Sequence, residues 1–113
     1  MDGCIFCRIV EGKAAAKVVE QDDAAVAFED IHPQSPVHIL IVPRKHIGSL
    51  DEAAQVDADL LGRLLLMAQR LARLRKIVSG YRIVINNGIG AGQSVFHLHV
   101  HLLGGRYYRW PPG

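Results

Sequence analysis

Three histidines stand at alternating positions near the C-terminal end of the 113-residue chain. His97, His99 and His101 are separated by Leu98 and Val100, so imidazole and apolar side chains alternate. Successive side chains of a β-strand point to opposite faces, so the pattern predicts a strand with its imidazoles on one face and its apolar side chains in the core. A row of imidazoles can attack an electrophile, transfer protons or bind a metal ion.

Three interpretations of this row are open. The first is a polar outer strand face that happens to carry histidines, although strict repetition at every second residue argues against chance. The second is a catalytic metal site, built from His-x-His and a third ligand. The third is nucleophilic catalysis. An imidazole with the ordinary pKa of about 6.5 is mostly neutral at pH 7, and it attacks phosphorus if an acceptor on its other nitrogen holds the correct tautomer.

A glycine-rich loop directly upstream favours phosphorus chemistry. Residues 87–94 read Asn-Gly-Ile-Gly-Ala-Gly-Gln-Ser, and they end three residues before His97. Main-chain N–H groups that no side chain shields can surround a phosphate, and Gln93 and Ser94 add side-chain donors. The alternative is a simple hairpin turn, but a turn does not account for the neighbouring histidines.

The elements that must position these residues follow from hydrophobic patterning. A β-branched apolar run at 37–42, bounded by Pro36 and Pro43, predicts a central strand buried on both faces. Several strands, one long helix and two further strands indicate an α+β domain with an antiparallel sheet, spanning residues 1–113 as a single domain. The other predicted elements are a short helix at 5–11 ending at Gly12, a hairpin of strands 18–20 and 24–28, a helix at roughly 57–78, and strands at 81–86 and 95–103.

The predicted long helix carries two apolar stripes, with Asp57 as its N-cap and Gly80 as its stop. Either the helix is buried deeply in one core, or one stripe packs on the sheet and the other on a second subunit. The first stripe is Leu60, Leu64, Met67, Leu71, Leu74 and Val78, and the second is Leu61, Leu65, Ala68 and Ala72.

Composition excludes several classes of protein. Half of the residues are hydrophobic, 21% are charged and the net charge is +2, which does not favour nucleic-acid binding. No apolar run approaches the roughly 18 residues of a membrane span, and the N-terminus lacks the pattern of a signal peptide. We therefore expect a cytoplasmic protein whose two cysteines, Cys4 and Cys7, are reduced.

The spacing of Cys4 and Cys7 lets both thiolates bind one metal ion. Two buried hydrophobic cysteines or a redox pair are the alternatives. The sequence has no thioredoxin-like βαβ pattern to support a redox pair.

Taken together, these segments resemble the histidine-triad family. Residues 93–103 match its motif His-φ-His-φ-His-φ-φ, where φ is an apolar residue. The resemblance to the Hint branch extends over nearly the whole chain, from Cys4 to Gly113. It is carried by residues 28–34, 38–46, 103–106 and 110–113.

The resemblance implies a five-stranded antiparallel sheet with one long helix and a short N-terminal helix. It further implies a homodimer in which two sheets join into one of ten strands. The implied activity is that of a purine nucleoside phosphoramidase, which hydrolyses the P–N bond of nucleoside 5′-phosphoramidates through a nucleotidyl-histidine intermediate. No catalytic metal is required for this chemistry.

The resemblance also implies a role for each matching residue. His99 would be the nucleophile, with His97 and His38 in the same histidine network. His101 and the main chain near Gly92 and Ser94 would bind the α-phosphate, and Ser94 would help to protonate the leaving amine. The nucleotide contacts would come from Phe28, Asp30, Ile31, Asn86, Gly92, Gln93, Ser94, His99 and His101, with Asp30 on the ribose and Phe28 and Ile31 on the base.

A zinc site is implied by the same route. Some bacterial members of the family, and the related galactose-1-phosphate uridylyltransferases, combine such a cysteine pair with two histidines. By analogy, His46 and His97 would join Cys4 and Cys7 as ligands. A closed site of two cysteines and two histidines has no open position for substrate, so the zinc would be structural.

Two residues depart from the Hint pattern, and two other functions stay open. Phe96 stands where many members have tyrosine, and His32 stands where a small polar residue is commoner. One alternative function is a dinucleoside polyphosphate hydrolase or nucleotidyl transferase of another branch. The other is a non-catalytic, zinc-stabilised nucleotide-binding module. An apolar base pocket does not select adenine over guanine.

Overall fold

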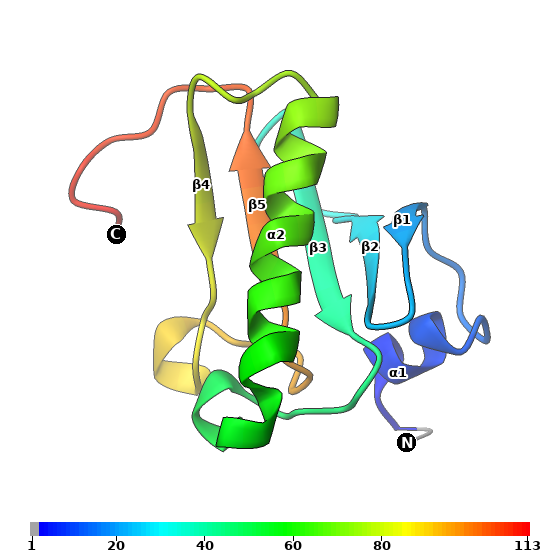
Figure 1. Ribbon diagram of the computed structural model, residues 1–113. Coiled ribbons are helices and arrows are strands. Elements are labelled where there is room, and N and C mark those ends of the chain that lie inside the picture. The colour runs from blue at the N-terminus through cyan, green and yellow to red at the C-terminus, as the bar shows by residue number, and fades with distance from the viewer. Residues whose placement is uncertain (1–2) are drawn as a thin grey trace.

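Five antiparallel strands form one sheet in the order β1-β2-β3-β5-β4 (Figure 1). The computed structural model describes residues 3–113. The strands are β1 (Val18–Gln21), β2 (Ala25–Glu29), β3 (Val37–Pro43), β4 (Tyr81–Val84) and β5 (Val100–Gly104). The helices are α1 (Ile5–Val10) and α2 (Ala58–Leu74), with short 3₁₀ turns at η1 (Leu50–Glu52), η2 (Gln55–Asp57) and η3 (Ile89–Ala91). The predicted α+β class, antiparallel sheet and single long helix are confirmed.

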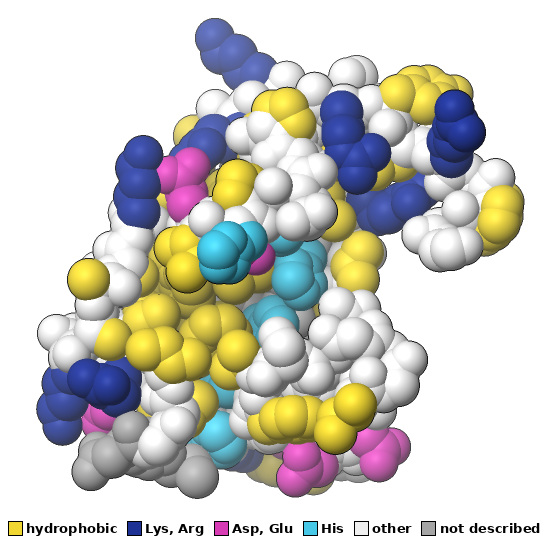
Figure 2. Space-filling model, turned by 180° about the vertical axis from the view of Figure 1, so that it is seen from behind, with side chains coloured by type: hydrophobic (Ala, Val, Ile, Leu, Met, Phe, Trp, Pro, Cys, Tyr) yellow, Lys and Arg dark blue, Asp and Glu magenta, His cyan; other side chains and the backbone are white. Residues whose placement is uncertain are grey.

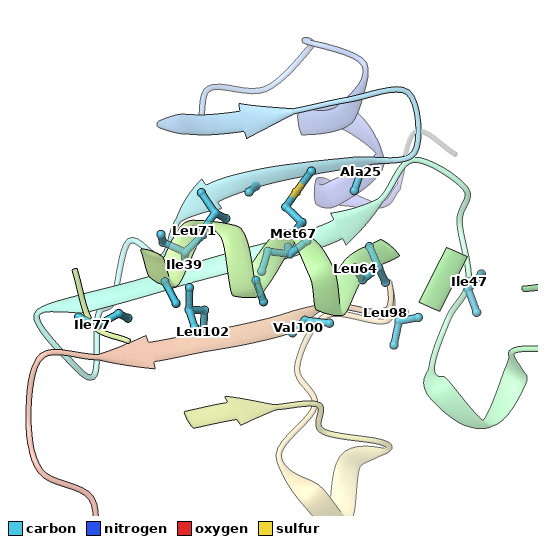
Figure 3. Packing of buried hydrophobic residues seen from close by; sticks show 14 residues of the cluster. Ala25, Ile39, Ile47, Leu64, Met67, Leu71, Ile77, Leu98, Val100 and Leu102 are labelled. Atoms are coloured by element: carbon cyan, nitrogen blue, oxygen red, sulfur yellow. The ribbon is translucent and has the colours of Figure 1, made fainter. Parts of the chain in front are cut away.

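The central strand β3 is buried on both faces, as its apolar run predicts. Ile39 and Ile41 belong to the core beneath α2, whereas Leu40 and Val42 belong to a second cluster on the α1 side. Successive strand residues point to opposite faces, so each helix covers one face of the same sheet. Figure 3 shows the α2 side, where this helix lies across β3 and β5.

Only part of the apolar surface of α2 is buried. Leu64, Met67 and Leu71 are buried against the sheet together with Ala68 and Ala72. Leu65 is 44% exposed, and Leu66, which neither predicted stripe included, is 58% exposed. The exposed side of α2 therefore mixes these leucines with polar residues such as Gln69, Arg70 and Arg73.

The helix α2 ends at Leu74, four residues before the predicted end, so Gly80 is not its stop. Lys76 adopts a left-handed conformation with φ of 60°, and its N–H donates to the Arg73 carbonyl at 3.1 Å. The Ile77 N–H donates to the Ala72 carbonyl at 3.0 Å, which completes a Schellman motif. This turn returns Ile77 to the core. It leaves Leu74 and Val78, both members of the first predicted stripe, exposed.

Asp57 directly precedes α2, as predicted, but its carboxylate does not cap the first turn of the helix. Its two oxygens accept instead from the Ala54 N–H at 2.9 Å and from the Lys45 ammonium at 2.6 Å. The side chain therefore ties the loop before the helix to the chain after β3.

The last strand is shorter than predicted and begins at Val100 rather than residue 95. The main chain of Leu98 leaves the sheet pattern, because its N–H donates to the Ile47 carbonyl at 2.6 Å. Two of the three histidines, His97 and His99, therefore precede the strand. Alternation still holds for the apolar residues, since Leu98, Val100 and Leu102 all lie in the core under α2. The fourth strand is also shorter, ending at Val84 rather than residue 86.

Two further features bear on the site and the surface. The tail after β5 leaves the sheet and passes beyond β4 (Figure 1), with Trp110 82% exposed. Within residues 3–113, neither helix has the length and apolarity needed to cross a membrane.

Candidate active site and metal centre

A cavity of about 380 Å³ opens on the α1 side of the sheet, and His99, His101 and Ser94 form part of its wall. We call it the histidine cavity. Figure 2 shows histidine side chains in cyan beside an apolar surface in yellow on this side of the molecule. The rest of its lining is Ile5, Phe6, Ile9, Ala15, Ala16, Phe28, Glu29, Asp30, Ile31, His32, Leu40 and Val95.

His99 is held in one tautomer. Its Nδ1 lies 2.7 Å from the main-chain carbonyl oxygen of His97. A carbonyl oxygen only accepts, so Nδ1 carries the hydrogen and the neutral ring keeps its lone pair on Nε2. The ring is 7% exposed and lines the cavity, so in its neutral form it could attack an electrophile bound there.

His101 is held in the opposite tautomer by His38. The Gln34 N–H donates to His38 Nδ1 at 3.0 Å, so the hydrogen of the neutral His38 ring is on Nε2. That nitrogen lies 2.9 Å from His101 Nδ1, to which it donates. His101 Nδ1 is thus an acceptor, and its hydrogen is on Nε2, available to an anionic ligand.

The same arrangement keeps both rings neutral. Burial lowers the pKa of His101 to about 4, with the neighbouring His99 and His38 rings acting in the same direction and Asp30 opposing them. Burial also lowers the pKa of His38, against the raising effect of the Asp30 carboxylate, whose oxygen lies 3.3 Å from His38 Nε2. At pH 7 the pair therefore acts as a chain of neutral hydrogen-bond donors.

Asp30, His38 and His101 offer atoms close enough together for a second metal ion. The hydrogen bond from the Gln34 N–H argues against a metal ion at this cluster. It occupies the lone pair of His38 Nδ1, so the hydrogen of the neutral ring is on His38 Nε2, the nitrogen that faces Asp30 and His101. A hydrogen-bond network accounts for this cluster without an ion.

The glycine-rich loop is a folded support for the cavity. Gly88 and Gly92 have φ of 87° and 93°, a region that residues with a side chain rarely adopt. The buried Gln93 amide donates to the Gly48 and Val95 carbonyls and accepts from the Gly88 N–H. Gln93 therefore braces the loop rather than offering side-chain donors to a ligand, while the exposed Ser94 lines the cavity.

Several predicted nucleotide contacts meet at this cavity, and others do not. Phe28, Asp30 and Ile31 line it, whereas Asn86, Gly92 and Gln93 are not among its lining residues. The contribution of α1, whose side chains supply much of the apolar wall, was not predicted from the sequence. Ile5 and Ile9 are four residues apart and so share one face of the helix, with Phe6 beside them. This spacing is the sequence pattern that would have indicated a contact face.

Two cysteines and two histidines meet beside the cavity. We call Cys4, Cys7, His46 and His97 the Cys/His centre, and their ligand atoms all lie within 4.8 Å of one another. The two sulfurs lie 3.4 and 3.5 Å from His97 Nδ1, and His46 Nδ1 lies 3.2 Å from the same nitrogen. The four residues predicted as metal ligands are therefore brought together.

The chemistry of this donor set fits zinc. The Pro43 carbonyl accepts from His97 Nε2 at 2.8 Å, so the lone pair of the neutral ring is on Nδ1, inside the centre. Such a second hydrogen bond is typical of a metal-ligating histidine. Burial raises the pKa of the Cys7 thiol, and Cys4 raises it further, which favours the neutral thiol. A bound cation would reverse this preference and favour the thiolate. Two thiolates and two imidazoles are a common set for structural zinc.

The fold and the row of histidines together define a class: an α+β domain with an antiparallel sheet and a row of imidazoles at a cavity. Comparison with known proteins gives the family. The HIT domain model matches residues 11–108. A HIT-like protein of Synechocystis, itself uncharacterised, is 48% identical over 109 residues, which is 96% of each chain. The present chain belongs to the HIT domain family.

Solved structures agree with this assignment. A HIT family hydrolase from Legionella pneumophila superposes with a TM-score of 0.95 at 46% identity, covering 97% of this chain and 99% of that one. A histidine triad protein from Clostridium difficile superposes with a TM-score of 0.93 at 34% identity, covering 96% of each.

Proposed function

We propose that the protein is a nucleotide hydrolase that cleaves the P–N bond of purine nucleoside 5′-phosphoramidates. The observation that carries the proposal is the 2.7 Å contact between His99 Nδ1 and the His97 carbonyl, which leaves the Nε2 lone pair of His99 free beside the histidine cavity. The similar Legionella protein is a HIT family hydrolase, which supports this assignment.

The reaction takes two displacements at phosphorus. His99 Nε2 forms a bond to the α-phosphorus while the P–N bond of the substrate breaks, and the leaving amine takes up a proton. Water then attacks the nucleotidyl-histidine, releasing the 5′-nucleotide and restoring the His99 lone pair. Dividing one displacement into two is the advantage of a covalent nucleophile.

Neutral donors surround the charge that develops on the phosphoryl oxygens. In this proposal the His101 Nε2–H and the main chain near Gly92 and Ser94 contact those oxygens, and the Ser94 hydroxyl assists protonation of the amine. Donors already fixed in place stabilise a transition state because they need little reorganisation. The hydrogen bond from His38 supports this role by fixing the His101 tautomer.

The nucleoside would occupy the apolar part of the cavity. Phe28 and Ile31 would contact the base and Asp30 the ribose hydroxyls, and all three line the cavity. Asn86 would contact the sugar and phosphate, and Gln93 would act through the loop that it braces. The wall is largely apolar, so the pocket would admit adenine and guanine alike.

The Cys/His centre would hold a structural zinc ion, which supplies stability by tying α1 to the loops that carry His46 and His97. We also propose that the chain works in the cytoplasm, where both thiols stay reduced.

A homodimer completes the proposal. Within the described residues β4 is an outer strand of the sheet, so one of its edges has no partner strand. The half-exposed Leu65 and Leu66 lie on α2. Pairing two β4 edges would produce the ten-stranded sheet and would bring these two leucines into the dimer contact.

The test of the proposed activity is His99→Ala on an adenosine 5′-phosphoramidate. We expect the fold, followed by circular dichroism, to persist and turnover to fall by at least about 10³-fold, as for loss of a covalent nucleophile. Phosphorus NMR with a panel of nucleotide amides, anhydrides and esters shows which bond breaks. Activity of the variant within a few-fold of the parent chain would overturn the nucleophile, and preference for a dinucleoside polyphosphate would move the protein to another branch.

A further inference from the structure

We propose that the Cys/His centre positions the nucleophile, and that His97 and Phe6 transmit its position to His99. The inference rests on the proposed function, in which His99 attacks phosphorus, and on zinc as the ion in the centre. It gives the metal-binding residues a part in substrate turnover beyond stability, although none of them is aimed at the reacting phosphorus.

The first connection runs through the main chain of His97. One ring nitrogen of His97 points into the Cys/His centre, and the other donates to the Pro43 carbonyl at 2.8 Å. The residue is fully buried, so a bound metal would hold its ring at both nitrogens. The carbonyl oxygen of this same residue accepts the His99 Nδ1–H at 2.7 Å. The group that selects the His99 tautomer therefore belongs to a metal-ligating residue.

The second connection runs through Phe6, which lies between the two cysteines in the sequence. Its ring packs edge-on against His99, with centroids 5.1 Å apart and an interplanar angle of 87°, and it also contacts His97 at 6.0 Å. Cys4 caps α1 by accepting the Cys7 N–H at 3.3 Å, so both ends of this short turn belong to the centre. Ligation of both sulfurs would fix the turn and with it the Phe6 ring.

These two contacts reach His99 from two segments that are far apart in the sequence. One begins in the segment before β5 and the other in α1, and the Cys/His centre is where the two segments meet. A nucleophile must stay aligned with phosphorus, and a displacement of about 1 Å can cost on the order of 10²-fold in rate. A centre that served stability alone would not need both connections to end on the nucleophile.

The experiment follows the His99 ring directly by long-range ¹H–¹⁵N NMR of protein labelled at histidine nitrogens. Spectra are compared for zinc-loaded protein, metal-free protein prepared with a chelator, and the same sample after zinc is added back. We expect a single Nδ1-protonated His99 ring with zinc, averaged or exchange-broadened signals without it, and recovery on addition. In parallel, kcat should fall about 10- to 100-fold without zinc, with a smaller change in KM.

Two variants separate positioning from stability. Leu71→Ala removes a buried side chain of α2 far along the chain from the centre, so it lowers the melting temperature and should leave the His99 tautomer intact. Phe6→Leu with zinc bound should keep that tautomer, since the His97 carbonyl is still present, but should shift the His99 ring resonances. His32, an exposed loop residue, is the internal reference in every spectrum.

Exchange of zinc for cadmium tests the proposal even if the metal-free chain does not fold. Cadmium is a larger ion that accepts the same ligands, so it should displace the His99 resonances while those of His32 stay in place. The proposal fails if the chain binds no zinc. It also fails if zinc binds while the His99 resonances are the same with and without metal, or the same with zinc and cadmium. Because the NMR signals need no turnover, a chain inactive on phosphoramidates still gives a result.

Discussion

At the scale of single residues, the site depends on which ring nitrogen carries each hydrogen. His99 and His101 lie two positions apart, yet a main-chain carbonyl fixes the tautomer of the first ring and another histidine fixes that of the second. The result is a lone pair on one ring and an N–H donor on its neighbour. Nucleophilic attack and phosphate binding require these two different states, and the proposed function assigns them accordingly.

The neutral state of His101 predicts how stability depends on pH. Its pKa is lowered to about 4 in the folded chain, against an ordinary value of about 6.5. The unfolded chain therefore binds the proton first as pH falls. The stability that this ring contributes is complete above about pH 6.5 and is lost by about pH 4, a change on the order of 3 kcal/mol.

Thermal melting of the parent chain and of His101→Asn between pH 7.5 and pH 4 measures this contribution. The variant lacks the titrating ring, so its melting temperature should fall less steeply over this range. Parallel curves for the two proteins would show that His101 is not the group responsible.

At the scale of elements, the two helices have different tasks. The long helix α2 supplies the main core beneath one face of the sheet, while the six-residue α1 covers the other face and forms part of the cavity wall. A helix as short as α1 has little stability of its own. Its place depends on packing, such as Phe6 against Phe28 at 5.4 Å, and on the cysteines at its start.

Local patterning predicts most of these elements but not their ends. The apolar run of β3 and the hairpin predicted from strands 18–20 and 24–28 are local features, and both appear in the structure. The start of β5 depends on a hydrogen bond from Leu98 to Ile47, which are far apart in sequence. The same limit applies to the site: the triad spacing points to His99, but the roles of Phe6 and the Pro43 carbonyl arise only when α1, β3 and the triad meet in space.

The end of α2 gives a prediction at this scale. Lys76 holds a left-handed conformation, which costs a residue with a side chain roughly 1–2 kcal/mol and costs glycine little. Glycine is also more flexible when unfolded, so Lys76→Gly should raise the free energy of unfolding by less than about 1 kcal/mol. Arg73→Gly is the control: it removes the same charge from a position inside the helix, so it should lower the free energy of unfolding by about 1 kcal/mol. Urea denaturation measures both changes in the free energy of unfolding. A loss of stability in Lys76→Gly would contradict the claim that the backbone of Lys76 is strained.

At the scale of the whole molecule, the edge of the sheet formed by β4 has no partner strand among the described residues. The outer strand β4 and the C-terminal tail lie at the end of the sheet opposite β1, and α2, with its exposed leucines, lies across β3 and β5 (Figure 1). A second copy of the chain that pairs through β4 would cover this edge of the sheet. It would leave the histidine cavity on the α1 face open.

Sedimentation at micromolar concentration tests the dimer. We expect the mass of two chains for the parent protein and a shift toward one chain for Leu66→Glu, which places a charge in the proposed interface. Val18→Glu is the matched control, because Val18 is 43% exposed on β1 at the other edge of the sheet. A monomeric parent chain, or equal dissociation of both variants, would refute the interface.

The central claim is that His99 itself bonds to phosphorus, and stereochemistry tests it most directly. The substrate is a nucleoside phosphoramidothioate of one configuration at phosphorus, hydrolysed in ¹⁸O-labelled water. Two in-line displacements, first by His99 and then by water, predict overall retention of configuration. Inversion would mean a single attack by water and would contradict a covalent intermediate on His99.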